Sequence, residues 1–185
     1  MVLRMKYINR WGLMKNFRNE SLSEHSLDVA VISHALAAIR NKRFGGNVNA
    51  ERAALLALFH DASEIITGDL PTPIKYYNPD ITSAFKDIEG IADKALFDMI
   101  PEDLQSEYDG LFSQNEDDKE LWGLVKAADK ISALIKCIEE ETAGNRDFSK
   151  AKQATAESIK KMNCPEADVF VSEFLPSFYL TLDEQ

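Results

Sequence analysis

The feature that most limits the fold of this chain is a series of Ala-, Leu- and Ile-rich segments with helical spacing, separated by glycine and proline. The two-residue alternation of β-branched residues that predicts a strand never lasts more than a few positions. Proline cannot continue a helix and glycine favours helix ends, so each break separates two elements. At 185 residues the chain has the length of one domain. The sequence therefore predicts a single all-α domain over residues 1–185.

The bounds of the predicted helices follow from their capping residues. The expected helices cover residues 23–41, 49–66, 79–100, 101–112 and 119–143, with shorter ones between Asp147 and Pro176. Asn49 is suited to cap the second of these helices, and Gly144 closes the longest one. The turn Thr67–Pro73 contains two prolines and ends the helical pattern between the second and third helices.

Acidic residues outnumber basic ones, 31 to 21, which gives a formal net charge of −10. A surface that binds a nucleic-acid polymer or an anionic membrane needs a basic face, so we expect neither partner. A small phosphorylated ligand remains compatible, because it needs only local positive charge or a metal ion. The two cysteines, Cys137 and Cys164, are too few for a disulfide framework, which favours a cytoplasmic protein. The longest apolar run is far short of the roughly 18 residues that span a membrane.

The first 18 residues contain basic side chains and no acidic one. The basic residues are Arg4, Lys6, Arg10, Lys15 and Arg18. An organelle-targeting peptide is one explanation, but such peptides are Ser-rich and this segment has no serine. We expect instead that segment 1–20 contributes local positive charge to a substrate site.

Histidine is scarce, with three in the chain, and this draws attention to a His60-Asp61 pair. The pair directly follows the apolar run Leu55–Phe59, so its side chains emerge from a helix that faces the core. Burying such groups without partners costs several kcal/mol, so they need partners. His25, at the start of the first long helix, and Asp129, which apolar residues flank in the longest one, are the candidates.

The order of His25, His60-Asp61 and Asp129 resembles the His…His-Asp…Asp signature of the HD-domain metal phosphohydrolases, whose fold is a compact helical bundle. Further motifs are similar to the bacterial YfbR-type 5′-deoxynucleotidase family over essentially the whole chain. They are Ile8-Asn9-Arg10-Trp11, Ser23-Glu24-His25-Ser26, His34–Ile39, Phe44–Arg52, His60–Glu64, Thr67–Pro73, Ala143-Gly144-Asn145 and Pro176-Ser177-Phe178. Lys130, where an uncharged residue is expected, departs from this pattern.

The resemblance implies that His25, His60, Asp61 and Asp129 bind one divalent metal ion per subunit. Two imidazoles and two carboxylates suit Co²⁺, Mn²⁺, Fe²⁺ or Zn²⁺, and the ligand types do not choose among these ions. The third histidine, His34, lies nine residues after His25, which places the two on opposite faces of a helix. We therefore expect His34 to be packed or on the surface, and the site to hold a single metal ion.

Glu64 follows His60 by four residues and so lies on the same helix face. The resemblance favours Glu64 as the catalytic group that orients the attacking water or handles a proton; the alternative is an exposed carboxylate in a last helical turn. For Asp69, the resemblance favours a hydrogen bond to a sugar hydroxyl over a role in capping the turn.

Arg10 is the first candidate for binding the substrate phosphate, because its planar guanidinium can contact two oxygens at once. Arg18 is the second, and the alternative role for each of the two is solvation of the surface. Trp11 is placed to pack on the deoxyribose. A ribose 2′-hydroxyl against the indole would lose its water partners, at a cost of about 1–3 kcal/mol, which would select against ribonucleotides.

The activity that the resemblance implies is hydrolysis of deoxyribonucleoside 5′-monophosphates to deoxynucleoside and phosphate by a metal-activated water, in a homodimer. A first alternative is an HD phosphohydrolase of another nucleotide, such as a dNTP or an alarmone, for which a deep basic pocket would be expected. A second alternative is a helical interaction protein with a structural metal site. Glu64 separates an enzyme from a protein with a structural metal site, because an enzyme would lose turnover without it.

Overall fold

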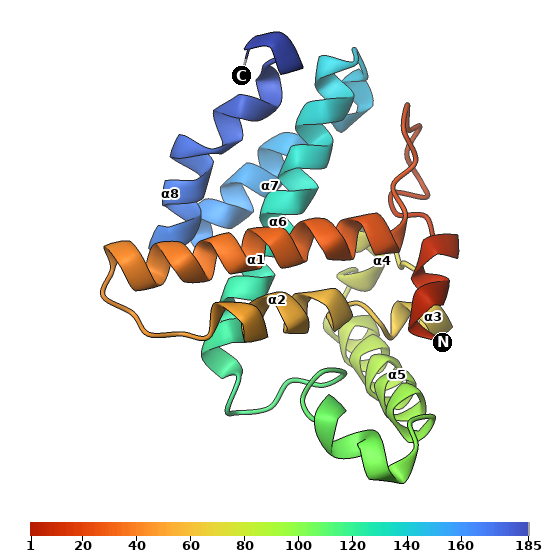
Figure 1. The fold of residues 1–185 in the computed structure, drawn as a ribbon. Helices are drawn as coiled ribbons and strands as arrows, with labels where there is room; N and C mark the ends of the chain where they lie inside the picture. Colours follow the sequence, from red (N-terminus) through yellow and green to blue (C-terminus); the bar gives the residue numbers. More distant parts are fainter. Residues whose placement is uncertain (185) are drawn as a thin grey trace.

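The computed structural model describes residues 1–184, and helices dominate this range (Figure 1). The α-helices are α1 (Leu22–Arg43), α2 (Ala50–Phe59), α3 (Glu64–Thr67), α4 (Thr72–Lys75), α5 (Pro79–Asp98), α6 (Lys119–Thr142), α7 (Ser149–Lys161) and α8 (Pro165–Glu173). Short 3₁₀ segments are η1 (Val2–Tyr7), η2 (Glu102–Tyr108), η3 (Arg146–Phe148), η4 (Leu175–Tyr179) and η5 (Leu182–Glu184). Within residues 1–184 the β-pairing is limited to one isolated bridge between Asn9 and Ser21. The prediction of an all-α fold is confirmed.

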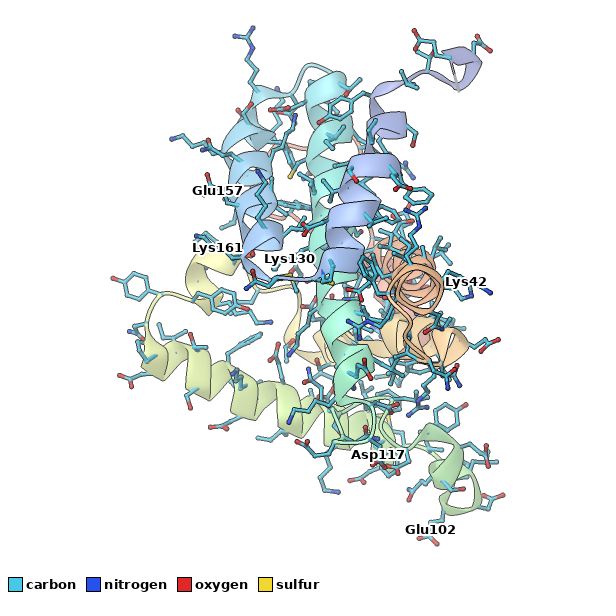
Figure 2. All side chains as sticks on the ribbon, turned by 90° about the vertical axis from the view of Figure 1, so that its left-hand side faces the viewer. Lys42, Glu102, Asp117, Lys130, Glu157 and Lys161 are labelled. Carbon is cyan, nitrogen blue, oxygen red and sulfur yellow. The ribbon has the colours of Figure 1, made fainter. Side chains whose placement is uncertain are left out.

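The core forms where α1 packs against α2 and crosses α6 (Figure 1). Its fully buried side chains come from all three helices and include Val29, Leu36, Leu56, Leu124, Ile131 and Ile138. Helices α7 and α8 pack along α6, whereas α5 lies outside this bundle and contacts α3 and α4 (Figures 1 and 2). The best packed helices are therefore those that carry or precede the predicted metal ligands. None of the helices in the described range is both long and apolar enough to cross a membrane.

Side-chain caps begin the main helices close to where the sequence predicts them. Ser21 and Glu24 form a reciprocal capping box that begins α1. The side chain of Asn49 accepts a hydrogen bond from the backbone N–H of Arg52 at the start of α2. Asn78 caps α5 in the same way. Each cap satisfies a backbone N–H that would otherwise lack a partner.

The predicted helix 49–66 is wrong in its second half, because α2 ends at Phe59 and α3 begins only at Glu64. His60 causes the break. Its ring nitrogen Nδ1 lies 2.7 Å from the backbone oxygen of Ala57, and its own N–H also bonds to that oxygen, in a 3₁₀-type turn. The chain then turns through residues 60–63, and this turn presents Asp61 beside His60.

The predicted helix 101–112 is also wrong in type, because the structure has only the 3₁₀ segment Glu102–Tyr108 there. The segment ends at Tyr108, because Asp109 leaves the helical conformation (ψ 132°) and Gly110 after it is left-handed (φ 70°). The break at Thr67–Pro73 is confirmed at Gly68 (φ 73°), although the short helix α4 already begins at Thr72.

Candidate active site

A cleft of about 710 Å³ opens between the N-terminal loop, the segment that leads into α4, and the facing sides of α6 and α7. Residues 10–14 form one wall and residues 69–73 another, while small side chains of α7 such as Ala154 and Ser158 line the far side. Asp61, Glu64 and Asp129 all reach the cleft. Most of the predicted site residues thus border one cavity of nucleotide size.

The four predicted metal ligands come together from three parts of the chain. His25 lies in the first turn of α1, His60 and Asp61 follow α2, and Asp129 lies in the middle of α6. His25 Nε2 lies 3.3 Å from Asp129 Oδ1 and 3.5 Å from Asp61 Oδ2, and His60 Nε2 lies 3.1 Å from the same Asp61 oxygen. One ligand atom each from His25, His60 and Asp61 lie within 4.8 Å of one another.

The ring nitrogens of the two histidines show that this group fits a metal ion. His25 Nδ1 lies 3.1 Å from the Ser132 hydroxyl, and His60 Nδ1 donates to the backbone oxygen of Ala57. Both Nε2 atoms are buried and form no hydrogen bond of good geometry with any described residue. Leaving two buried nitrogens without a well-directed hydrogen bond is costly, whereas a bound cation satisfies both. A second hydrogen bond that fixes the ring is typical of metal-binding histidine.

The charges of the group also fit a cation. Burial alone would raise the pKa of Asp129, but the His25 imidazole, whose Nε2 lies 3.3 Å from Asp129 Oδ1, holds that pKa at about 2. Burial likewise opposes the charge on Asp61, and His60 and His25 lower its pKa well below its usual value. Both carboxylates are therefore ionised at neutral pH, as metal ligands must be.

Glu64 is the first residue of α3 and is only 7% exposed. Its Oε2 atom is buried and has no hydrogen-bond partner among the described residues. Burial, together with the nearby carboxylates of Asp61 and Asp69, raises the pKa of Glu64 to about 9. The alternative of an exposed, solvated carboxylate at this position is therefore wrong, and Glu64 holds a proton at neutral pH in the metal-free protein.

Arg10 and Trp11 lie side by side at the cleft and share one carboxylate. Glu20 Oε2 accepts a hydrogen bond from Arg10 (2.8 Å) and another from the indole of Trp11 (3.0 Å). A second guanidinium nitrogen of Arg10 lies 4.0 Å from Asp129 Oδ1. Trp11 has a left-handed backbone (φ 61°), and its ring lies 5.2 Å from that of Phe148. Glu20 has no motif that would have marked it in the sequence.

Two other charged residues border the cleft without having been predicted there. Lys75 pairs with Glu89 of α5 at 2.7 Å, and Lys130 Nζ lies 3.9 Å from Asp129 Oδ2. The sequence marks Lys130 only as a departure from the family pattern.

Arg18 is not brought to the cleft. Its side chain is 74% exposed and pairs with Glu24 on the surface. The reason is that its backbone is bound to α6 on the other side, which turns the side chain outward. His34 lies exposed on α1, as expected for a histidine outside the site.

Comparisons with known proteins identify the family of this chain. The family described as 5′-deoxynucleotidase YfbR-like matches residues 1–178. The chain is 52% identical over 181 residues to 5′-deoxynucleotidase YfbR of Escherichia coli O1:K1 / APEC, which covers 98% of this chain and 91% of that protein.

Solved structures show the same fold. An HD-domain phosphohydrolase from Listeria innocua superposes with a TM-score of 0.81 at 23% identity, over 96% of this chain and 85% of that one. The cyanophage S-2L HD phosphohydrolase DatZ, bound to dA and one catalytic Zn²⁺ ion, gives a TM-score of 0.66 at 21% identity, over 97% and 95% of the two chains. Together with the match over nearly the whole sequence, these findings make the chain a member of the YfbR-like 5′-deoxynucleotidase family.

Proposed function

We propose that this protein hydrolyses deoxyribonucleoside 5′-monophosphates to deoxynucleoside and phosphate, in a single HD domain over residues 1–185. The observation that carries the proposal is the convergence of His25, His60, Asp61 and Asp129 on one side of a nucleotide-sized cleft. Membership in the YfbR-like family supports the substrate class. Segment 1–20 contributes Arg10 and Trp11 to the same cleft.

His25, His60, Asp61 and Asp129 are the proposed ligands of one divalent metal ion, and Co²⁺ or Mn²⁺ are our first candidates. Such an ion, when bound, supplies positive charge next to the phosphate and makes water a stronger nucleophile at neutral pH. Ser132 and the backbone oxygen of Ala57 hold the two imidazoles in the orientation that this role needs.

The remaining residues act on the substrate and on protons. The Arg10 guanidinium binds phosphate oxygens, and its bond to Glu20 fixes the direction in which its free N–H groups point. Glu64 orients the attacking water or transfers a proton, for which a buried carboxyl group with a raised pKa is suited. Trp11 packs on the deoxyribose, and Asp69 accepts a hydrogen bond from a sugar hydroxyl.

The decisive experiment measures phosphate release by metal-stripped protein after addition of Co²⁺, Mn²⁺, Mg²⁺ or Zn²⁺. The substrates are matched pairs: dAMP against AMP, and the 5′- against the 3′-monophosphate of deoxyadenosine. We expect metal-dependent release from the deoxy 5′ compound alone. No release with any metal would contradict the proposal and direct the assay to dNTPs and alarmones.

A Glu64→Ala variant separates an enzyme from a protein with a structural metal site. We expect the variant to bind metal as the wild type does, measured by calorimetry, and to lose turnover. Full turnover in this variant would show that the role given to Glu64 is wrong. If the wild type also binds metal normally but shows no turnover, the result would favour a structural metal site.

We further propose that the protein is a cytoplasmic homodimer that pairs through α5. This helix exposes Ile88 and Ile91, and Ile81 lies one heptad before Ile88 on the same stripe. A surface stripe of this kind on a helix outside the bundle is typical of an interface. Light scattering after size-exclusion chromatography tests the pairing: Ile91→Glu should convert a dimer to a monomer, whereas a wild-type monomer would contradict it.

A further inference from the structure

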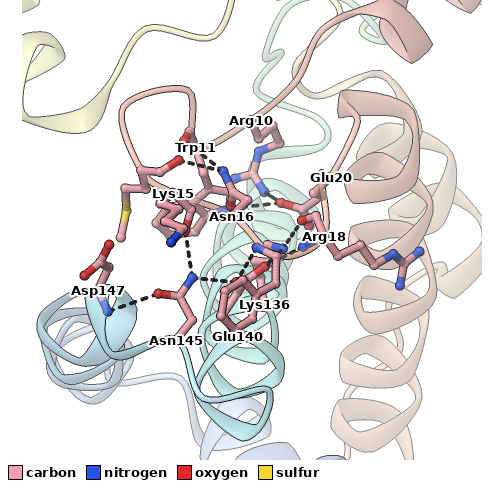
Figure 3. Close-up of polar contacts among 12 residues, drawn as sticks. Arg10, Trp11, Lys15, Asn16, Arg18, Glu20, Lys136, Glu140, Asn145 and Asp147 are labelled. Carbon is pink, nitrogen blue, oxygen red and sulfur yellow. Dashed lines mark hydrogen bonds and ion pairs between the residues drawn. The ribbon is translucent and has the colours of Figure 1, made fainter.

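A cluster of buried polar side chains lies between α6 and residues 15–18 of the N-terminal loop (Figure 3). Lys136 and Glu140 belong to α6, and Asn145 follows it; their exposed fractions are 3%, 2% and 5%. None of the three borders the cleft. Burying charged side chains is costly unless they are hydrogen-bonded. The contacts of these residues therefore show which part of the chain they hold in place.

The carboxylate of Glu140 accepts four hydrogen bonds. Its Oε2 accepts from the backbone N–H of Phe17 (2.9 Å) and from Asn145 Nδ2 (2.7 Å). Its Oε1 accepts from the backbone N–H of Arg18 (3.2 Å) and from Lys136 Nζ (2.5 Å). Burial opposes the charge, but these donors lower the pKa of Glu140 to about 2. The carboxylate is therefore charged and fully bound at any pH at which the protein would work.

The partners of Glu140 also hold the loop by its carbonyl groups. Lys136 Nζ donates to the backbone oxygen of Arg18 (2.5 Å), and Asn145 Nδ2 donates to that of Lys15 (2.7 Å). Every one of these loop contacts is to main-chain atoms. The cluster thus fixes the path of the backbone over residues 15–18, whatever the side chains there do.

The other half of the same loop carries Arg10 and Trp11. The loop is closed at its base by a main-chain hydrogen bond, from the backbone N–H of Arg10 to the backbone oxygen of Glu20 (2.9 Å). Within the loop, Asn16 Nδ2 donates to the backbone oxygen of Trp11 (3.2 Å), next to the residues that Glu140 binds. The left-handed backbone of Trp11 is uncommon for a large side chain and persists only where surrounding contacts enforce it.

Helix α6 connects this cluster to the metal site. Glu140 follows Asp129 by eleven residues, which at 100° per residue places the two within about 20° of each other and about 16 Å apart along the helix. One rigid helix therefore presents a metal ligand at one point and the anchor of the loop at another. Movement of residues 15–18 relative to Asp129 would require that the Glu140 contacts break.

We propose that Glu140, supported by Lys136 and Asn145, is a positioning residue that fixes Arg10 and Trp11 at the cleft through the main chain of residues 15–18. The inference rests on the proposed roles of Arg10 and Trp11 in substrate binding. Glu140 touches neither the substrate nor the metal ligands; it acts through the loop.

The test compares Glu140→Gln with Glu141→Gln, the same change one residue along α6, where the side chain pairs with Lys152 instead. Hydrogen exchange followed by mass spectrometry reports the loop directly. We expect Glu140→Gln to lose protection over residues 10–18 and to raise KM for dAMP about 10-fold or more, with kcat and metal affinity changed less. Glu141→Gln should behave as the wild type in all four measurements.

A double-mutant cycle with Trp11→Ala shows whether Glu140 acts through the loop. If it does, Glu140→Gln has a smaller effect on KM in the Trp11→Ala background than in the wild type. Additive effects, or unchanged exchange over residues 10–18, would overturn the inference. Asn145→Ala, which leaves the pair of Lys136 and Glu140 intact, takes the place of Glu140→Gln if that variant does not fold. If the wild type releases no phosphate from dAMP, the proposed function has failed, and hydrogen exchange alone then decides whether Glu140 orders the loop.

Discussion

The ring nitrogen Nδ1 of His25 lies 3.1 Å from the hydroxyl of Ser132. Ser132 lies three residues after Asp129 on α6, so one helix supplies both a proposed metal ligand and the group that orients another. Hydrogen bonds of this type hold the imidazole in one tautomer with the second nitrogen directed at the metal.

We predict that Ser132→Ala weakens metal binding about 10- to 100-fold, because the His25 ring loses the partner that orients it. Isothermal titration of metal-stripped protein with Co²⁺ or Zn²⁺ measures the change. Ser26→Ala is the matched control, since Ser26 is buried next to His25 but its hydroxyl has no hydrogen-bond partner in residues 1–184. Equal affinities in Ser132→Ala and Ser26→Ala would contradict the orienting role.

Glu64 should make the metal-free protein less stable as the pH rises. Its pKa is about 9 in the folded protein, above the usual 4.5, so the unfolded chain releases this proton first. The contribution of Glu64 to stability therefore decreases between about pH 4.5 and 9.

A Glu64→Gln variant removes this pH dependence. We expect the metal-free variant to be more stable than the metal-free wild type by about 1–3 kcal/mol near pH 8, and by little near pH 5. Denaturant unfolding in the presence of a chelator, at both pH values, gives the comparison. A constant difference between the two pH values would show that Glu64 is already ionised in the folded protein.

Trp11 should determine the preference for deoxyribose. We expect Trp11→Ala to reduce the ratio of kcat/KM for dAMP over AMP about 10-fold, because the 2′-hydroxyl regains access to water when the indole is removed. Trp122→Phe is the control, since Trp122 is buried in the core and does not border the cleft. An unchanged ratio in Trp11→Ala would show that Trp11 does not determine the selectivity for deoxyribose.

A comparison of Arg10 with Arg18 tests whether phosphate binding depends on the location of the arginine side chain. Arg10 lies at the cleft with its guanidinium bound to Glu20, whereas the Arg18 side chain is on the surface. Replacing arginine with lysine keeps the charge but loses the planar pair of donors. We expect Arg10→Lys to raise KM for dAMP about 10-fold, and Arg18→Lys to leave it unchanged. The reverse result would show that the two residues have been assigned in the wrong order.

Much of the fold could be predicted from the sequence, because caps and breaks act over a few residues. The α1 helix begins at Leu22 within one residue of its predicted start, and Asn49 and Asn78 cap the helices that follow them. The predicted helix 49–66 fails for a local reason that the pattern of apolar residues does not contain. His60 bonds back to Ala57 and ends α2 early, although the apolar spacing continues to Ile66.

The candidate site divides in the same way. The proposed metal ligands His25, His60, Asp61 and Asp129 could be selected from the sequence, because histidine is scarce and the spacing resembles that of a known family. Glu20 and Glu140 could not be found, since an acidic residue among 31 carries no signal of its own. Their roles depend on contacts with residues up to 123 positions away, as between Glu140 and Phe17.

The sequence by itself therefore determined the helical class, the family and the residue types of the site, since these depend on composition, local spacing and motif order. The tertiary structure alone decided that Arg18 faces solvent, that Glu64 is buried with a raised pKa, and that Glu140 anchors the loop. The physical reason is that burial, pKa and side-chain direction are set by neighbours across the fold. Those neighbours come together only when α1, α2 and α6 pack around one core.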